Sequence, residues 1–433
     1  MFERIRGVFA VAELRQRIIY TLLMLLVFRI GVHIPVPGVD ARTFADILSR
    51  AWGGIFQFVS MFTGGGLRYF SLFALGVIPY INVSIIMSLL MAVFPKLKEL
   101  QQQGREGRKK ITQYTRWGTV GMAAIMSVGY AMLAVNAGVA KPSPTFFLTA
   151  IIAMTTGSIF LMWIGERITE NGIGNGISMI IMAGIVARYP YYFSQIYTNV
   201  STGAVSVLWL VIFVVMFVVV IAAATVLQQA QRKIVVQYAK RTAGRRIYGG
   251  HTAHLPIRVN QGGVIPIIFA LAILQLPYLV FRAVPSTKAI AVYFAPPHPV
   301  YLTLYALLII FFAYFYASII FDPNDVAKNL REAGGFVPGV RPGQPTALYL
   351  QDVSNKILLV GALFLTAIAL IPYILGAASG LRASTLLWLG GTSLLIVVGV
   401  GIDTLMQIEA HLVMHHYESL IKGTGAAFLG RRR

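Results

Sequence analysis

The sequence contains no cysteine, so disulfide bonds, thiolate metal sites and a cysteine nucleophile are all excluded. It also lacks the G-x-x-x-x-G-K-[ST] phosphate loop and the H-E-x-x-H metal motif, and no serine is placed to pair with a histidine or lysine inside an apolar run. Charge is scarce too, since only 12% of the residues are Asp, Glu, Lys or Arg, about half the share usual in soluble proteins. We therefore expect no enzymatic activity and no cofactor.

Apolar residues dominate instead: 57% of the 433 residues are hydrophobic and the mean hydropathy is +0.74. Apolar runs of about 17 to 25 residues recur, the length that crosses a hydrocarbon layer of ~30 Å. The fifth run is weak, because Arg188 and Pro190 follow only about 13 apolar positions. The sequence predicts an all-α membrane protein with ten transmembrane helices near 17–35, 73–94, 114–138, 146–169, 175–197, 203–227, 262–281, 300–321, 355–376 and 384–406.

The net charge of +21 comes from 36 Lys and Arg residues against 15 Asp and Glu residues, and its distribution predicts an orientation. The loops 95–116 and 228–260 carry seven basic residues each. Without the fifth span they would lie on opposite sides of the membrane, which the positive-inside bias disfavours. We therefore keep ten spans and expect both the N-terminus, 1–16, and the C-terminal tail, 407–433, to be cytoplasmic.

The tetrapeptide Gly-Val-Ile-Pro occurs twice, at 76–79 and at 263–266. The first copy begins the second span, which runs inward, and the other begins the seventh, which runs outward. Five spans separate the two, which favours two inverted five-helix halves, 17–200 and 201–406. The alternative is a coincidence among residues that are common in membrane helices.

A short apolar stretch between the first two spans is too short to cross the membrane. It runs from Ile55 to Phe62, about 12 Å as a helix, between glycine clusters at 53–54 and 64–66. Backbone that enters a membrane without spanning it must be surrounded by protein or line a cavity. We expect a short re-entrant helix with a glycine hinge; a helix lying in the outer interface is the alternative.

The interior of the predicted bundle carries no coupling site for ions. All acidic residues fall in loops or near span ends, the deepest being Glu166 and Asp403, whereas ion-coupled transporters use carboxylates or histidines near the midplane. A passive conduit fits better. Near the middle of the broken spans, the residues that would line it are Ile81, Ile85, Ile177, Ile181, Ile268 and Ile396. Alternatively, apolar residues at this spacing face lipid or a neighbouring helix.

Six blocks of sequence carry a family resemblance. They are ALGVIPYINVSIIMSLL, GRKKITQYTRWGT, GERITENGIGNGISMIIMAGIV, RKIVVQYAKRTAGRRIYGGHTAHLPIRVNQGGVIPIIFA, GGFVPGVRPGQPTALYL and GGTSLLIVVGVGIDTL. Together they resemble the bacterial SecY family, the channel subunit of the Sec protein-conducting complex, from about Arg15 to Ile421. The resemblance implies two inverted halves around an hourglass pore, a plug helix after the first span, and a seam between spans two/three and seven/eight that opens to lipid.

The resemblance also assigns residues. It maps the six isoleucines to a pore ring, whose branched tips would exclude hydrated ions by dewetting without binding a passing peptide. It maps a plug, near 55–66, to Ile55, Phe56, Phe58, Val59, Met61, Phe62, Gly64, Gly65 and Gly66. Asn82 and Ser84 are gate candidates, which either bond across the seam or bond back within their own helix.

The two large cytoplasmic loops resemble those that dock the ribosome or the SecA motor. Guanidinium groups suit rRNA phosphates or motor carboxylates, although Gln344 stands where the family often has an acidic residue. The candidate docking residues are Arg245, Arg246, Arg341, Pro342 and Gly343. Alternatively, the basic residues only fix the topology and bind anionic lipids, an interpretation that suits Lys96, Lys98, Lys109 and Lys110.

The implied setting is the inner membrane of a bacterium. The implied partners are SecE-like and SecG-like small subunits, SecA, the ribosome, signal peptides and nascent chains, and anionic lipids. Two other functions stay open from sequence. A secondary transporter for a small solute would also use inverted repeats, and a membrane anchor that recruits ribosomes would explain the basic loops but not the glycine-flanked segment.

Overall fold

The computed structural model places the chain in two compact units, one formed by Met1–Tyr197 with Ile396–Arg433 and the other by Thr198–Leu395. Each unit is described by itself. The residues described are 11–41, 43–45, 47, 60, 62–202, 206–238, 240–243, 246–249, 252–283, 287–296, 298–379 and 391–429.

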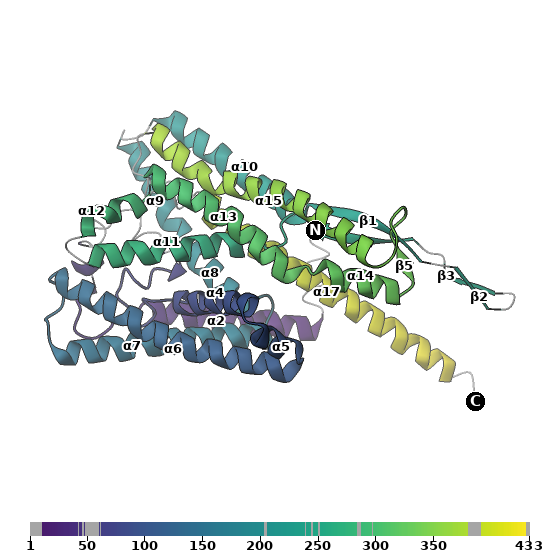
Figure 1. The fold of residues 1–433 in the computed structure, drawn as a ribbon. Coiled ribbons are helices and arrows are strands. Elements are labelled where there is room, and N and C mark those ends of the chain that lie inside the picture. Colours follow the sequence, from purple (N-terminus) through teal and green to yellow (C-terminus); the bar gives the residue numbers. More distant parts are fainter. Residues whose placement is uncertain are drawn as a thin grey trace. The chain divides into compact units, whose positions relative to one another are not determined.

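The first unit consists of helices (Figure 1). They are α2 (Ala12–Val32), α4 (Ile78–Val93), α5 (Pro95–Gln102), α6 (Arg105–Asn136), α7 (Pro144–Asn171), α8 (Gly176–Val186), most of α9 (Tyr189–Ser201) and α17 (Gly391–Leu429) from Ile396 onward.

The second unit contains helices and two small sheets. The helices are α10 (Val207–Gln229), α11 (Ile265–Ala283), α12 (Lys288–Ala291), the 3-10 helix η2 (Val292–Phe294), α13 (Pro299–Ile320), α14 (Pro323–Glu332) and α15 (Gln344–Ser379). The strands are β1 (Gln231–Tyr238), β2 (Lys240–Ala243), β3 (Arg246–Gly249), β4 (Thr252–Arg258) and β5 (Gly335–Phe336).

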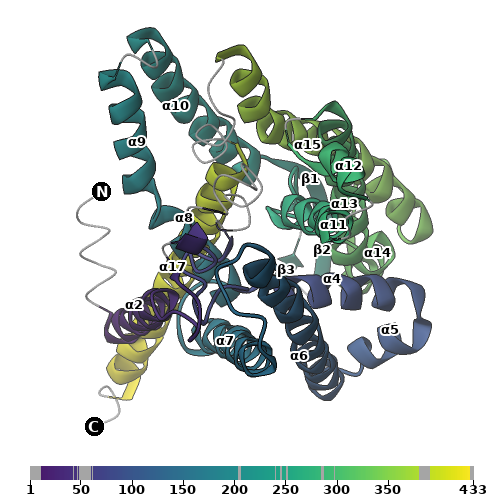
Figure 2. The ribbon, with the colours of Figure 1, turned by 90° about the vertical axis from the view of Figure 1, so that its left-hand side faces the viewer.

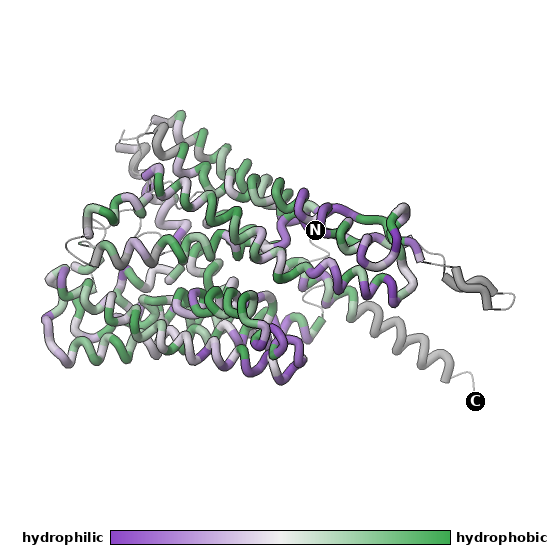
Figure 3. The backbone as a smooth tube through the Cα atoms, in the orientation of Figure 1, coloured by the Kyte–Doolittle hydropathy of each residue, from purple (hydrophilic) through white to green (hydrophobic). Residues whose placement is uncertain are grey.

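Apolar helices confirm the predicted membrane architecture, and their hydrophobic character is plain in Figure 3. Among the described residues, five helices are long and apolar enough to cross a membrane, or six if α4 and α5, bent by 102°, count as one. Shorter apolar stretches cover Val214–Gln229 and Ile265–Leu274. Within the described residues, each predicted span overlaps a helix or a helix pair, and the weak fifth span consists of α8 and α9. The count of ten crossings stays a prediction.

The repeated Gly-Val-Ile-Pro segment is also a local structural repeat. Gly76 and Gly263 both adopt left-handed backbone conformations, with φ of 58° and 59°. α4 and α11 each begin two residues later, and both prolines lie in the first turn, where a missing N–H costs nothing. The same four residues therefore produce the same turn into a helix in each unit.

Helices of the first unit pack closely where glycines face them. α6 lies against both α4 and α7, and α2 lies against α7 (Figures 1 and 2). A Cβ atom on Gly157 of α7 would overlap the carbonyl oxygen of Leu72, and the neighbouring Ser158 donates a hydrogen bond to the carbonyl of Gly76 at 3.0 Å. The segment before α4 is thereby fixed on α7.

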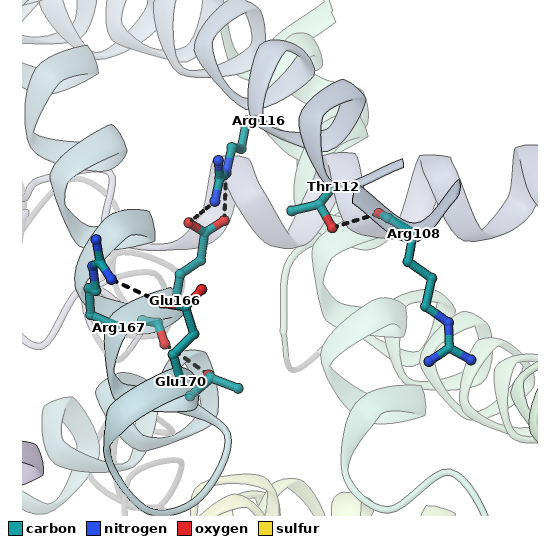
Figure 4. A network of polar contacts seen from close by, with 8 residues as sticks. Arg108, Thr112, Arg116, Glu166, Arg167 and Glu170 are labelled. Atoms are coloured by element: carbon teal, nitrogen blue, oxygen red, sulfur yellow. Dashed lines mark hydrogen bonds and ion pairs between the residues drawn. The ribbon is translucent and has the colours of Figure 1, made fainter. Parts of the chain in front are cut away.

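An ion pair joins α6 to α7 near the ends of their spans (Figure 4). The guanidinium of Arg116 donates to both oxygens of Glu166, at 2.9 and 2.6 Å. Arg167 pairs with Glu170 one turn along α7, at 3.1 Å. The two-pronged geometry of the first pair fixes the rotation of one helix relative to the other.

The second unit is built around α13. This helix packs between α11 and α15, and α10 lies against α15. Small residues permit the close approach of α13 to α15: the core there contains Ala313, Ala317, Leu358 and Ala362. Outside these helices the ribbon formed by β1 to β4 extends away from the bundle of its own unit (Figure 1).

Candidate functional site

Five of the six predicted ring isoleucines are buried: Ile81, Ile85, Ile181, Ile268 and Ile396. Ile177 is half-buried and packs against Gly165 of α7. None of the five lies on the exposed surface where lipid would contact it. Ile268 belongs to the second unit and the others to the first, so their convergence on one axis stays a prediction.

Part of the predicted plug segment is described. Ile55, Phe56, Phe58, Val59 and Met61 lie outside the described residues, whereas Phe62 and Gly64 to Gly66 lie within them. Phe62 is buried. Gly64 and Gly65 have φ of 61° and 95°, in the left-handed region that favours glycine. The glycine run therefore forms tight turns packed inside the first unit.

Two arginines from the predicted spans form hydrogen bonds with residues of the predicted plug segment, 55–66. Arg29 of α2 donates a hydrogen bond to the carbonyl oxygen of Gly64 at 2.9 Å. Arg188, at the break between α8 and α9, hydrogen-bonds to the hydroxyl of Ser60 and lies 5.8 Å from the ring centre of Tyr192. A cation inside a membrane protein needs polar partners of this kind, and here Gly64 and Ser60 lie within the predicted plug segment, 55–66.

The gate candidates lie on α4. Asn82 is buried and Ser84 is half-buried. The carbonyl of Ser84 accepts a hydrogen bond from the hydroxyl of Ser88 at 2.8 Å, a back-bond within the helix. The proposed seam involves both units, so a role in a gate stays a prediction for both residues.

The first predicted docking loop forms an antiparallel ribbon. β1 pairs with β4 from Gln231↔Arg258 to Gln237↔Thr252, and β2 pairs with β3 further out. Residues 228–260 contain seven basic and no acidic residues. Arg246 begins β3, while Arg245 lies outside the described residues. The ribbon is therefore a strongly cationic projection.

The second predicted docking loop is attached to this ribbon. β5 pairs with the end of β1 through Gln237↔Phe336 and Tyr238↔Gly335, which gives the strand order β4-β1-β5. A shared core lies beneath the sheet, made of Ile234, Ile257, Val337 and Leu350. Two loops that are far apart in sequence thus form one folded element.

Arg341, Pro342 and Gly343 follow β5 in a defined turn. Arg341 and Pro342 are exposed. The hydroxyl of Thr346 donates to the carbonyl of Arg341 at 2.8 Å, and Gly343 has a φ of 103°. The turn presents the Arg341 guanidinium to solvent from a fixed backbone.

Sequence reasoning missed two features. The ribbon has a signal in hindsight, because Ile234, Val236 and Ile257 are buried on one face and alternate with exposed residues. The other is the turn from α7 to α8, which side chains from distant helices hold by hydrogen bonds. Spacing along the chain gives no signal for such contacts.

Comparison with known proteins identifies the family. A family model described as SecY matches residues 71–405. The protein translocase subunit SecY of Thermotoga maritima is 44% identical over 432 residues, with 98% of each chain covered. The chain belongs to the SecY family. The match confirms the resemblance drawn from the six sequence blocks and extends it over nearly the full length of a known SecY.

Solved structures share the SecY fold. A SecY channel, whose plug domain is described as stabilising the closed state and maintaining a membrane seal, has a TM-score of 0.67 at 19% identity, with 92% of both chains covered. Sec61 in a canine ribosome–channel complex has a TM-score of 0.64 at 18% identity, again with 92% of both chains covered. At these identities the solved structures establish the fold of this chain alone. Its family membership is established by the family model and by the SecY of Thermotoga maritima.

Proposed function

We propose that this chain is the pore subunit of a protein-conducting channel, which passes secretory proteins across a membrane and releases membrane proteins sideways into the bilayer. The observation that carries the proposal is the 44% identity to a translocase subunit over 98% of both chains. The chain is a multi-pass membrane protein that conducts a polypeptide and catalyses no reaction. Its setting is the inner membrane of a bacterium, with both termini in the cytoplasm.

The six isoleucines form the constriction of the pore. Their branched side chains present no hydrogen-bonding partner, so they exclude hydrated ions by dewetting and leave a passing peptide free to move. Burial of five of them supports this role over a lipid-facing one. The plug, near 55–66, seals the pore, and Asn82 and Ser84 are the candidates for the gate at the seam.

The ribbon and the Arg341 turn dock the partners that drive transport, SecA or the translating ribosome. Seven basic residues in 228–260 without one acidic residue favour a polyanionic or acidic surface. SecE-like and SecG-like subunits complete the membrane complex, and signal peptides and nascent chains pass through it. Anionic lipids bind the lysines around α5, which are Lys96, Lys98, Lys109 and Lys110.

Replacing Arg341 by Glu should reduce transport driven by SecA or by the ribosome, with little loss of protein from the membrane. The side chain is exposed on a turn whose backbone contacts do not involve it, so the fold should tolerate the change, while reversal of charge repels an acidic partner. Transport of a preprotein into inverted vesicles measures the effect. Lys141→Glu, an exposed cation between α6 and α7 that lies outside both docking loops, is the control. Normal transport by the Arg341 variant would mean that this contact is wrongly assigned.

A photocrosslinking residue at position 268 tests the pore directly. In an assembled complex that holds an arrested presecretory chain, the probe should form an adduct with that chain, because Ile268 belongs to the constriction. A probe at Leu307, an exposed apolar position on α13, should react with lipid instead. Absence of an adduct at 268 in an active complex would contradict the pore assignment and favour a transporter or an anchor.

A further inference from the structure

The turn that joins α7 to α8 is held by side chains of two other helices, α2 and α17, and of α7 itself. The N–H of Ile173 donates to the hydroxyl of Thr21 on α2 at 3.0 Å. The N–H of Gly174 donates to Oε1 of Gln407 on α17 at 2.9 Å. The N–H of Gly176 donates to the hydroxyl of Thr169 on α7 at 2.8 Å. All of these residues belong to the first unit.

This arrangement differs from ordinary helix capping. The first N–H groups of a helix lack partners within it and are usually satisfied by its own capping residue or by water. Asn175 does cap α8, by accepting from the N–H of Ser178 at 3.1 Å. The bonds to Thr21 and Gln407, however, span 152 and 233 residues of sequence. They tie the start of α8 to α2 and α17.

The turn packs so closely against its neighbours that three of its positions accept only glycine. A Cβ atom on Gly172 would meet the Thr21 hydroxyl and would lie 2.6 Å from the carbonyl oxygen of Ile168. One on Gly176 would overlap the carbonyl oxygen of Gly165 on α7. Gly174 has a φ of 83°, which other residues rarely adopt. The backbone of the turn therefore lies in direct contact with Thr21 of α2 and with the backbone of α7.

We propose that Thr21 is a positioning residue, which, with Thr169 and Gln407, sets the position of α8 along its axis and thereby the height of Ile177 and Ile181. Ile177 is the second residue of α8 and Ile181 follows one turn later. The consequence for the pore rests on the proposed function, in which these two side chains belong to the constriction.

Thr21 contributes most among the three holding residues. Its side chain is buried at 4% exposure, whereas Thr169 and Gln407 are exposed and their hydrogen bonds compete with water. The Thr21 hydroxyl accepts from Ile173 and donates to the carbonyl of Arg17 at 2.9 Å. Valine has the same shape but no hydroxyl, so Thr21→Val leaves a buried N–H without a partner.

The experiment uses the absence of cysteine. Ile181→Cys introduces a single thiol, and its rate of reaction with a thiol reagent in the assembled complex reports how often α8 leaves its buried position. Thr21→Val should raise that rate roughly five- to 150-fold, the effect on an equilibrium of leaving one buried donor unsatisfied. Thr21→Ser keeps the hydroxyl and should restore the original rate. The matched control is Thr119→Val, which removes a buried hydroxyl that bonds within its own helix at 2.7 Å.

Each outcome is decisive. An unchanged labelling rate in Thr21→Val, or an equal increase in Thr21→Ser, would overturn the positioning role. If the complex with Thr21→Val fails to assemble, Gln407→Leu at the exposed end of the turn gives the same measurement, with Gln113→Leu, exposed on α6, as its control. Resting ion leak of the variants without the cysteine is the second readout. Faster labelling with unchanged leak would support the positioning role and contradict the pore role of Ile181.

Discussion

Deleting residues 55–59, part of the proposed plug, is expected to raise the resting ion conductance of the channel. A constriction that must admit a polypeptide would be a partial barrier to ions, and in the proposed function the plug supplies the remaining seal. The deletion should end before Ser60, because the following residues contact Arg29, Arg188 and Ser158 and belong to the folded core of the first unit. Ion flux from vesicles that contain the reconstituted complex should rise from background to a substantial fraction of the flux through an open pore.

A replacement of the same length controls for chain length. Exchanging 55–59 for alternating glycine and serine keeps the connection but removes the apolar side chains, and it should leak as the deletion does. Transport of a preprotein should persist in both variants, since neither change touches the docking loops. Flux at background in both variants would mean that this segment is not a seal and would favour a helix on the outer surface.

Replacing Gly157 by Ala should cause the second large effect, a loss of unfolding free energy near the upper end of about 1–3 kcal/mol. The added methyl group would overlap the carbonyl oxygen of Leu72 and lie 3.1 Å from the Cγ atom of the same residue. Backbone cannot turn aside as a flexible side chain can, and the hydrogen bond from Ser158 to Gly76 holds the segment in place. Thermal unfolding of the purified complex measures the loss.

Gly121→Ala is the matched control for this prediction. Gly121 lies inside α6, and apart from the neighbouring backbone of that helix nothing lies within 4 Å of where its Cβ would stand. Alanine is favoured over glycine in a helix by roughly 0.8–1 kcal/mol, so the control should be neutral or slightly stabilising. Equal destabilisation of the two variants would show that the contact with Leu72 does not decide the effect.

The membrane helices could be predicted from sequence because the length of each apolar run and the prolines at helix starts determine them locally. α4, α7 and α13 each have a proline in the first turn. Each of these helices coincides with one of the apolar runs predicted to cross the membrane. The break between α8 and α9 coincides with the polar Arg188 that made the fifth run weak. These features need only neighbouring residues.

The pore could not be derived in this way. An isoleucine pair with a spacing of four, such as Ile81 and Ile85, looks the same whether it faces lipid, another helix or a conduit. Burial of both residues depends on which helices pack around α4. The family resemblance supplied the assignment where the spacing left it open.

Long-range hydrogen bonds are equally invisible in sequence. Thr21 reads as one polar residue in an apolar run, and its contact with Ile173 exists only because α2 lies beside the start of α8. The pairing of β5 with β1 likewise joins residues about one hundred positions apart, and two residues of strand are too few for any periodic signal.

The strand order β4-β1-β5 has a mechanical consequence. A β-hairpin attached only at its base could bend, and a force on its tip would not reach the helices. Here β5 braces the ribbon from the side, and the shared core of Ile234, Ile257, Val337 and Leu350 seats it on α15. A load on the ribbon is therefore passed to α15, a helix long and apolar enough to cross a membrane.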